Sequence, residues 1–347
     1  MALDDEKAQS HWAPALRTAW AVPCALTLTA VIYGSWAVVA KVALGQHGVV
    51  PLVLAFYRAL GGSTLMFMMH RAVEAGKPES FSVSRISRAD AFRFLGLGLL
   101  LALNIGGNIL AVQALTSILV AVFQPLLPVI AGLAAALLGV EELSLLKVLG
   151  IFCATTGAVV VVIFSPAAQH HHTTSAINFA QGIPCLLINV TGGALYTVCQ
   201  KSVLRSHPPI LTAAAAFAGA TCFLLVGAVC TGGLDHDAWR LGNSPKALLA
   251  LVYAILLVTA LNYSVMAWAN KLSSPTTVTS FLTLQPICAA VLACIFLHEI
   301  LTWGQVAGAV TIIAGLACFV LSSRDAQSPW EAQALVPTKH QPVCENS

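Results

Sequence analysis

Residues 91–113 read AFRFLGLGLLLALNIGGNILAVQ, an apolar run with one charge, Arg93, close to its beginning. About 20 consecutive apolar residues of α-helix cross the ~30 Å hydrocarbon core of a bilayer. The run therefore predicts a transmembrane helix. Two asparagines, Asn104 and Asn108, interrupt its apolar character in the second half. Amide side chains within the membrane require hydrogen-bond partners and usually face the interior of the helix bundle.

The rest of the chain has the same character as this run. Of its 347 residues, 58% are hydrophobic and 9% are charged, whereas soluble domains have about 25% charged residues. This composition excludes the ordinary soluble classes. The net charge of +3 is too small and too scattered for a nucleic-acid-binding surface.

Ten helices are predicted from apolar runs and from the Pro- and Gly-marked breaks between them. Their ranges are 20–44, 51–71, 91–113, 117–139, 145–164, 181–203, 209–231, 247–269, 275–297 and 303–322. A count of nine would require two of these to be fused, across a Pro- or Gly-marked break.

The predicted organisation has five parts. They are a cytoplasmic N-terminal segment (1–19), a first repeat (20–164), a polar linker (165–180), a second repeat (181–322) and a disordered cytoplasmic tail (323–347). In the ten-helix arrangement, the loop 72–90 and both termini lie on the same side of the membrane. Most Lys and Arg residues outside the helices lie on this side. Because such residues are enriched in cytoplasmic loops, both ends are expected to be cytoplasmic.

An internal repeat is the most informative feature of the sequence. A shift of 158 residues superimposes 91–164 on 249–322 without a gap, and matches of Ala, Leu and Val alone would count for little in so apolar a chain. The less common matches are Asn104 with Asn262, Phe123 with Phe281, Pro128 with Pro286, Glu141 with Glu299, Gly150 with Gly308, and Gly157 with Gly315. A shift of 160 adds Lys41 with Lys201 and His47 with His207.

Each predicted half has five helices, an odd number, so the second half enters the membrane in the opposite direction. Inverted repeats of this kind are typical of secondary transporters. The predicted fold class is an all-α membrane protein with ten transmembrane helices arranged as two inverted five-helix repeats.

Two segments resemble a known family. YGSWAVVAKVAL (33–44), followed by Phe56-Tyr57-Arg58, and the run 281–315 with Pro286 and Gly308 are similar to plant nodulin-like EamA permeases of the drug/metabolite transporter superfamily. The resemblance implies two EamA repeats, movement of metabolites such as amino acids, and a plasma-membrane or vacuolar location. Sugar-phosphate and nucleotide-sugar carriers belong to the same superfamily and are the alternative. Their phosphate-binding members have Lys and Arg in the last helices, whereas 275–297 and 303–322 contain neither.

Arg58 is the one formal charge well inside an apolar run, about 10 Å from the start of its helix at 1.5 Å per residue. A buried cation is costly unless it is paired, and the carboxylate of a solute is a suitable partner. The alternative is that Arg58 extends its side chain to the membrane interface.

Further solute contacts are predicted from polar and aromatic residues near mid-membrane. Asn104 and Asn262 occupy matched positions of the two halves, with Gln285 nearby, and Trp36 and Tyr263 are candidates for an aromatic wall. Hydrogen bonding between helices is the alternative for the asparagines. Glu141 and Glu299 are predicted to cap the next helix, and Pro128 and Pro286 to kink their helices.

These features favour a secondary transporter that moves a small organic metabolite, an amino acid or another small anionic or zwitterionic solute, by alternating access. The expected partners are this small-molecule solute and membrane lipids, with a homodimer left open and no nucleic acid. No Asp occurs within a predicted helix and no metal-binding spacing is present, so neither an enzyme nor a cofactor is expected. A membrane sensor or scaffold without transport is the alternative from another class.

Overall fold

The structure is a computed structural model. It describes residues 20–36, 39–40, 43–45, 49–74, 87–115, 120, 123–142, 144–164, 176–232, 239–240, 244–297 and 302–325. The predicted segment 1–19, most of the linker 165–180, nearly all of the tail, Lys41, His47 and Glu299 lie outside these residues.

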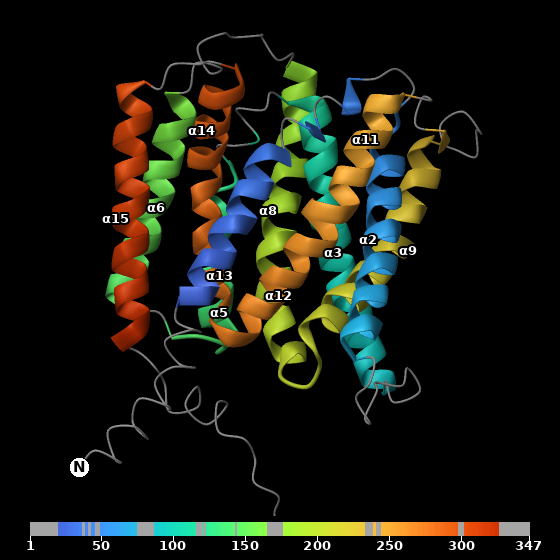
Figure 1. Cartoon of the computed structure of the whole chain (residues 1–347), viewed down its shortest axis with the longest axis horizontal. Coiled ribbons are helices and arrows are strands. Elements are labelled where there is room, and N and C mark those ends of the chain that lie inside the picture. The colour runs from blue at the N-terminus through green and yellow to red at the C-terminus, as the bar shows by residue number, and fades with distance from the viewer. Residues whose placement is uncertain are drawn as a thin grey trace, which may run out of the picture.

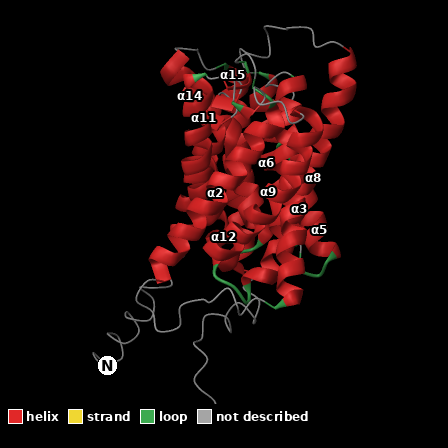
Figure 2. Ribbon diagram, turned by 90° about the vertical axis from the view of Figure 1, so that its right-hand side faces the viewer, coloured by secondary structure: helices red, strands yellow, loops and turns green. Residues whose placement is uncertain are grey.

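The described residues form helices and no strand (Figure 2). The first helix spans Trp20–Trp36. The others are α2 (Pro51–Glu74), α3 (Arg88–Ala114), α5 (Leu126–Leu137), α6 (Leu145–Ile163), α8 (Ala176–Leu204), α9 (Pro209–Gly232), α11 (Pro245–Tyr253), η3 (Ala254–Leu261), α12 (Asn262–Leu272), α13 (Pro275–Phe281), η4 (Leu282–Leu284), α14 (Gln285–Leu297) and α15 (Trp303–Asp325).

Each of the ten predicted ranges overlaps helix in this structure. Seven helical stretches among the described residues are long and apolar enough to cross a bilayer, and two shorter apolar helices, Trp20–Trp36 and Leu126–Leu137, accompany them. The chain is therefore an integral, multi-pass membrane protein. The number ten for the spans stays a prediction, because the shorter helices do not reach the length of a crossing by themselves.

Serine residues set the beginnings of four helices. Ser87, Ser144, Ser244 and Ser274 lie immediately before α3, α6, α11 and α13, and each side chain accepts a hydrogen bond from a backbone N–H in the first turn. These bonds satisfy donors that have no partner within the helix. The capping serines therefore fix the residue at which each of these four helices begins.

The helices run roughly parallel to one another in three groups (Figure 1). On one side α6 packs against α15, in the middle α3 packs against α8, and on the other side α2 packs against α9. The helices that meet in the middle, α3 and α8, come from different predicted repeats, so the two halves are interleaved rather than separate.

Glycines bring α6 and α15 together in a reciprocal way. A β-carbon at Gly150 would lie 2.8 Å from the carbonyl oxygen of Gly315, and one at Gly157 would lie 2.7 Å from that of Gly308. The first member of each matched pair therefore contacts the second member of the other. Such a reciprocal contact is what a two-fold axis between two equivalent helices produces.

The predicted helix 247–269 is distorted where it crosses the middle of the bundle. The stretch Pro245–Leu272 is continuous, but its central part, η3, is a π-helix in which hydrogen bonds run from residue i to i+5. The equivalent part of α3, at the shift of 158, is an ordinary α-helix. Hydropathy does not distinguish the two forms.

The prolines break their helices instead of kinking them in the middle. Pro286 is the second residue of α14, which follows the short 3-10 turn η4, and Pro128 is the third residue of α5. A proline in the first turn of a helix loses no hydrogen bond, since the N–H groups there have no partner within the helix. The expectation of a mid-helix kink was therefore wrong for Pro128, whereas Pro286 follows the 3-10 distortion η4 within the continuous helical stretch 275–297.

Candidate functional site

A cavity of about 150 Å³ lies between the helices in the middle of the bundle. Its wall is formed by residues of the first helix, α2, α3, α5, α8, α12, η4 and α14, together with Val120 and Gln124, and these belong to both predicted repeats. The lining continues along α3 as far as Val112, two residues before this helix ends, and along α2 to Arg58, seven residues after it begins. The cavity therefore extends from mid-depth toward the end of the bundle where α2 begins and α3 ends.

Arg58 is the one charged side chain among the residues that line this cavity in the described part of the chain. It is 5% exposed, its Nε donates to Thr259 Oγ1 at 2.9 Å, and its Cζ lies 4.9 Å from the ring centroid of Trp36. This distance is within the range of a cation–π contact. The burial contradicts the alternative that Arg58 extends to the membrane interface.

Asn104 is tied to the facing helix α8 on the cavity wall. Its Nδ2 donates to the carbonyl oxygen of Asn189 at 2.9 Å, and Asn189 Nδ2 donates back to the carbonyl oxygen of Asn104 at 2.8 Å. Tyr263 donates its hydroxyl to Asn104 Oδ1 at 3.2 Å, and Gln124 donates to Asn189 Oδ1 at 3.0 Å. The four side chains form a connected polar strip on the wall that joins α3, α8, α12 and the turn before α5.

Aromatic rings close the other sides of the cavity. Tyr263 packs edge-to-face against Tyr33 and Tyr196, with ring centroids 6.1 Å apart in both pairs. Trp36 lies beside Arg58. The cavity thus combines one cation, a strip of amides and an aromatic wall, a combination that is suited to a small solute with one charged end.

Asn262 does not reach the cavity. Its side chain is fully buried, and Nδ2 donates to the carbonyl oxygen of Thr29 at 3.4 Å in the first helix. This bond matches the one between Asn104 and the carbonyl oxygen of Asn189, because Asn262 follows Asn104 by 158 residues and Asn189 follows Thr29 by 160. Both asparagines therefore join equivalent helices, and Asn104 in addition faces the cavity.

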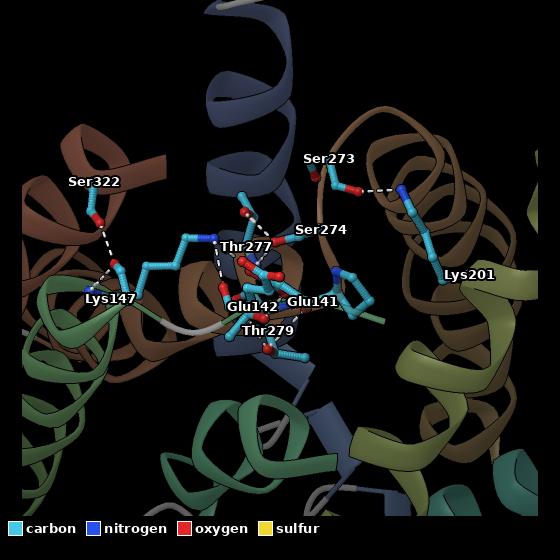
Figure 3. A network of polar contacts seen from close by, with 12 residues as sticks. Glu141, Glu142, Lys147, Lys201, Ser273, Ser274, Thr277, Thr279 and Ser322 are labelled. Atoms are coloured by element: carbon cyan, nitrogen blue, oxygen red, sulfur yellow. Dashed lines mark hydrogen bonds and ion pairs between the residues drawn. The ribbon is translucent and has the colours of Figure 1, made fainter. Parts of the chain in front are cut away.

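The opposite end of the bundle is held together by charged and hydroxyl side chains (Figure 3). Lys147 Nζ lies 3.0 Å from Glu141 Oε1, and the two side chains are 8% and 6% exposed. The other carboxylate oxygen of Glu141 accepts hydrogen bonds from the hydroxyl and the backbone N–H of Thr276, in the first turn of α13. Glu141 therefore connects α6 with α13, and the expectation that it caps the next helix was wrong, since Ser144 caps α6.

Lys201 contributes to the same end of the bundle. Its Nζ donates to the carbonyl oxygens of Asn270 at 2.8 Å and Ser273 at 2.5 Å, at the C-terminus of α12. A cation is favourable there because the last carbonyl groups of a helix have no partner within it. Lys201 is buried, and its ammonium group binds the backbone at the end of α12.

Of the six side chains predicted for solute contact, five line the cavity: Trp36, Arg58, Asn104, Tyr263 and Gln285. Sequence reasoning missed Asn189 and Thr259. Asn189 was detectable as an amide within the apolar range 181–203. Thr259 could not be identified from the sequence, because threonine is common in membrane helices. Its role depends on a contact with Arg58 of another helix, α2.

No metal-binding arrangement of three or more His, Cys, Asp or Glu side chains occurs within the described ranges. The fold and the cavity thus define a class: a multi-pass helical membrane protein with a polar and aromatic cavity between its helices. Comparisons with known proteins narrow this class.

The model of the EamA-like transporter family matches residues 20–163 and 180–321. The chain belongs to this family, and so to the drug/metabolite transporter superfamily. It is a membrane transporter of this superfamily.

Relatives and solved structures agree with this assignment. The chain is 27% identical over 350 residues to Protein WALLS ARE THIN 1 of Arabidopsis thaliana, covering 91% of this chain and 88% of that protein. It is 24% identical over 324 residues to a WAT1-related protein of the same plant, covering 84% of each. A protein of known crystal structure superposes with a TM-score of 0.69 at 17% identity, over 89% of this chain and 99% of that one, which supports the fold.

Proposed function

We propose that this transporter carries a small anionic or zwitterionic organic solute, such as an amino acid, and binds its carboxylate at Arg58. The observation that carries the proposal is the state of this arginine. It is buried on the cavity wall, and no carboxylate among the described residues pairs with it. A buried cation is costly without a partner, and a solute carboxylate in the cavity would supply one.

The size and charge of the cavity favour a small solute over the alternative, a nucleotide-sugar or sugar-phosphate carrier. A cavity of about 150 Å³ has the size of one that holds a benzene molecule, whereas sites for larger ligands have roughly 300–1,000 Å³. A phosphate group also favours several cations or N–H donors around it. The cavity provides one cation, Arg58.

Alternating access between two inverted five-helix repeats is the mechanism that we propose. Two observations support the inverted relation: the reciprocal glycine contacts of α6 with α15, and the equivalent bonds of Asn104 and Asn262. A third observation supports alternating access itself, because the two ends of the bundle differ. The cavity extends toward one end of the bundle, while the other is tied by Glu141, Lys147 and Thr276 across α6 and α13.

The tied end is proposed to be cytoplasmic, because the Lys and Arg residues predict this side for both termini. The cavity then extends toward the outside of the cell or toward the vacuolar lumen, since the resemblance to plant EamA permeases favours those two membranes. The structure would thus correspond to a state that is closed to the cytoplasm.

Substitution of Arg58 tests the proposal. Uptake of labelled amino acids and small carboxylic acids into proteoliposomes is measured for wild type, Arg58→Lys and Arg58→Gln, normalised to protein in the membrane. Gln is expected to abolish uptake of carboxylates, and Lys to restore it poorly, because an ammonium group does not form two parallel hydrogen bonds with a carboxylate.

Arg71→Gln is the matched control, since Arg71 belongs to the same helix but is exposed near its end. It is expected to transport as wild type does. Wild-type uptake of carboxylates by Arg58→Gln, in a protein that is present at normal amounts, would contradict the proposal.

A further inference from the structure

The π-helical segment η3 packs against the part of α2 that carries Arg58. Thr259 is fully buried in this segment, and its hydroxyl accepts the hydrogen bond from Arg58 Nε at 2.9 Å. α2 has two successive glycines, Gly61 and Gly62, at the contact. A β-carbon at Gly62 would lie 2.2 Å from Cγ2 of Thr259, so the methyl group of Thr259 occupies the space that a side chain would need.

The two repeats differ at this contact and match around it. At the shifts of 158 and 160, the counterparts of Thr259 and Arg58 are Leu101 and Ala218, which are apolar. The counterpart of η3 in α3 is an ordinary α-helix. The repeat produces two equivalent contacts, α2 with η3 and α9 with α3. The π-helix, the threonine and the arginine all belong to the first of these contacts, and the second has none of them. π-Helical turns within α-helices are frequent at functional sites.

The bond to Thr259 determines which edge of the guanidinium group is free. A carboxylate pairs with arginine through two parallel N–H groups, either at the side of the group, which uses Nε, or at its end, which uses the two Nη atoms. Thr259 occupies Nε, and Trp36 covers one face of the group at 4.9 Å from Cζ. The end with the two Nη atoms stays available to the cavity.

We infer that Thr259, placed by the π-helical segment η3, is a positioning residue that holds Arg58 for end-on, two-bond recognition of a planar carboxylate. This inference rests on the proposed function, because it takes Arg58 as the solute's partner. It adds a residue outside the cavity lining and a defined direction of approach: the carboxylate lies in the plane of the guanidinium group, on the extension of the Arg58 side chain.

The test measures the protection of Arg58 against chemical modification, and needs no knowledge of the natural solute. Purified protein is treated with 2,3-butanedione, which modifies guanidinium groups, and the modified arginines are mapped by mass spectrometry. Propionate and propionamide serve as probes because they have the same shape and differ in charge. The exposed Arg71, Arg93 and Arg205 act as internal controls that neither probe should protect.

In wild type, propionate is expected to protect Arg58 and propionamide is not. In Thr259→Val, which removes the hydroxyl and keeps the shape, the propionate concentration for half protection should rise about fivefold, as expected for loss of one positioning hydrogen bond. Thr259→Ser, which keeps the hydroxyl, should stay close to wild type. Thr279→Val is the matched control, since Thr279 is also fully buried but bonds to its own helix, at the carbonyl oxygen of Pro275.

The outcomes separate the two proposals. Equal protection of Arg58 by propionate in wild type and in folded Thr259→Val would overturn the positioning role and leave the carboxylate proposal standing. Absence of propionate protection in wild type would overturn the carboxylate proposal itself. If Thr259→Val does not fold, Thr259→Ala supplies the same loss of the hydroxyl with less volume, and the same comparison decides.

Discussion

Replacing Glu141 with Gln is expected to loosen the tied end of the bundle. In the structure this carboxylate is 6% exposed, lies 3.0 Å from the ammonium group of Lys147, and accepts two hydrogen bonds from Thr276. Removing one partner of a buried ion pair costs about 3–5 kcal/mol, because the other charge stays buried without its partner. Lys147 keeps a bond to the carbonyl oxygen of Glu142 at 3.4 Å, so the lower value, about 3 kcal/mol, applies.

Such a loss would change the balance between conformations by about 150-fold, since 1.4 kcal/mol corresponds to a factor of ten. If this end opens during transport, the substitution destabilises the state in which the end is closed. The fraction of molecules that are open to this side then rises. The assay uses a cysteine at Met266, which lines the cavity, in a background without the ten native cysteines. A thiol reagent that does not cross membranes is applied from the side of Glu141, and labelling of Met266→Cys is expected to rise.

Two further variants sharpen the result. Glu142→Gln is the matched control, because the neighbouring side chain is exposed and only its backbone contacts Lys147; labelling should not change. The double variant Glu141→Gln with Lys147→Met removes both charges and should return labelling toward the wild-type value, since an apolar replacement of both partners is often neutral. Wild-type labelling in folded Glu141→Gln would refute the reasoning that this cluster keeps the end closed.

Two other predictions concern the packing that holds the halves together. Gly157→Ala should lower the melting temperature by the equivalent of about 1–3 kcal/mol, because its β-carbon would lie 2.7 Å from the carbonyl oxygen of Gly308. Gly96→Ala, whose β-carbon meets nothing within 4 Å, should not lower it, and equal melting of the two variants would exclude tight α6–α15 packing. Asn262→Ala should lower the melting temperature and leave propionate protection of Arg58 unchanged, whereas Asn104→Ala should affect both, as their positions outside and on the cavity wall require. Reduced protection in Asn262→Ala alone would contradict this division.

The sequence predicted the helices well because the signal for them is local. An apolar run of about 20 residues in a bilayer has few alternatives to a helix, since its backbone groups must be satisfied internally. The predicted range 51–71 became Pro51–Glu74, and 209–231 became Pro209–Gly232. The π-helical segment η3 and the 3-10 turn η4 were not predicted, because they depend on how neighbouring helices pack and leave the hydropathy of the run unchanged.

The candidate site was predicted to the extent that its residues are rare in membrane helices. Arg58 and Asn104 were found because a cation and an amide in hydrocarbon require a partner, and both line the cavity. The same reasoning selected Asn262, but it does not say whether the partner is a solute or a backbone carbonyl group, and in the structure it is the carbonyl of Thr29. The burial of Arg58 was likewise undetermined, since the distance from a helix end does not say which neighbour covers the side chain.

The repeat explains where in the bundle a site for an asymmetric solute has to form. Where the two halves are equivalent they make equivalent contacts: Asn104 and Asn262 each bond to a backbone carbonyl, and α6 and α15 exchange glycine contacts. A contact of this kind does not distinguish one end of a solute from the other. Arg58 has no cationic counterpart, since Ala218 stands at its equivalent position, and the π-helical turn that positions it has an α-helical counterpart. If the proposed function holds, the charged end of the solute is expected where the symmetry of the repeat is broken, and the symmetric contacts are expected to hold the two halves together during alternating access.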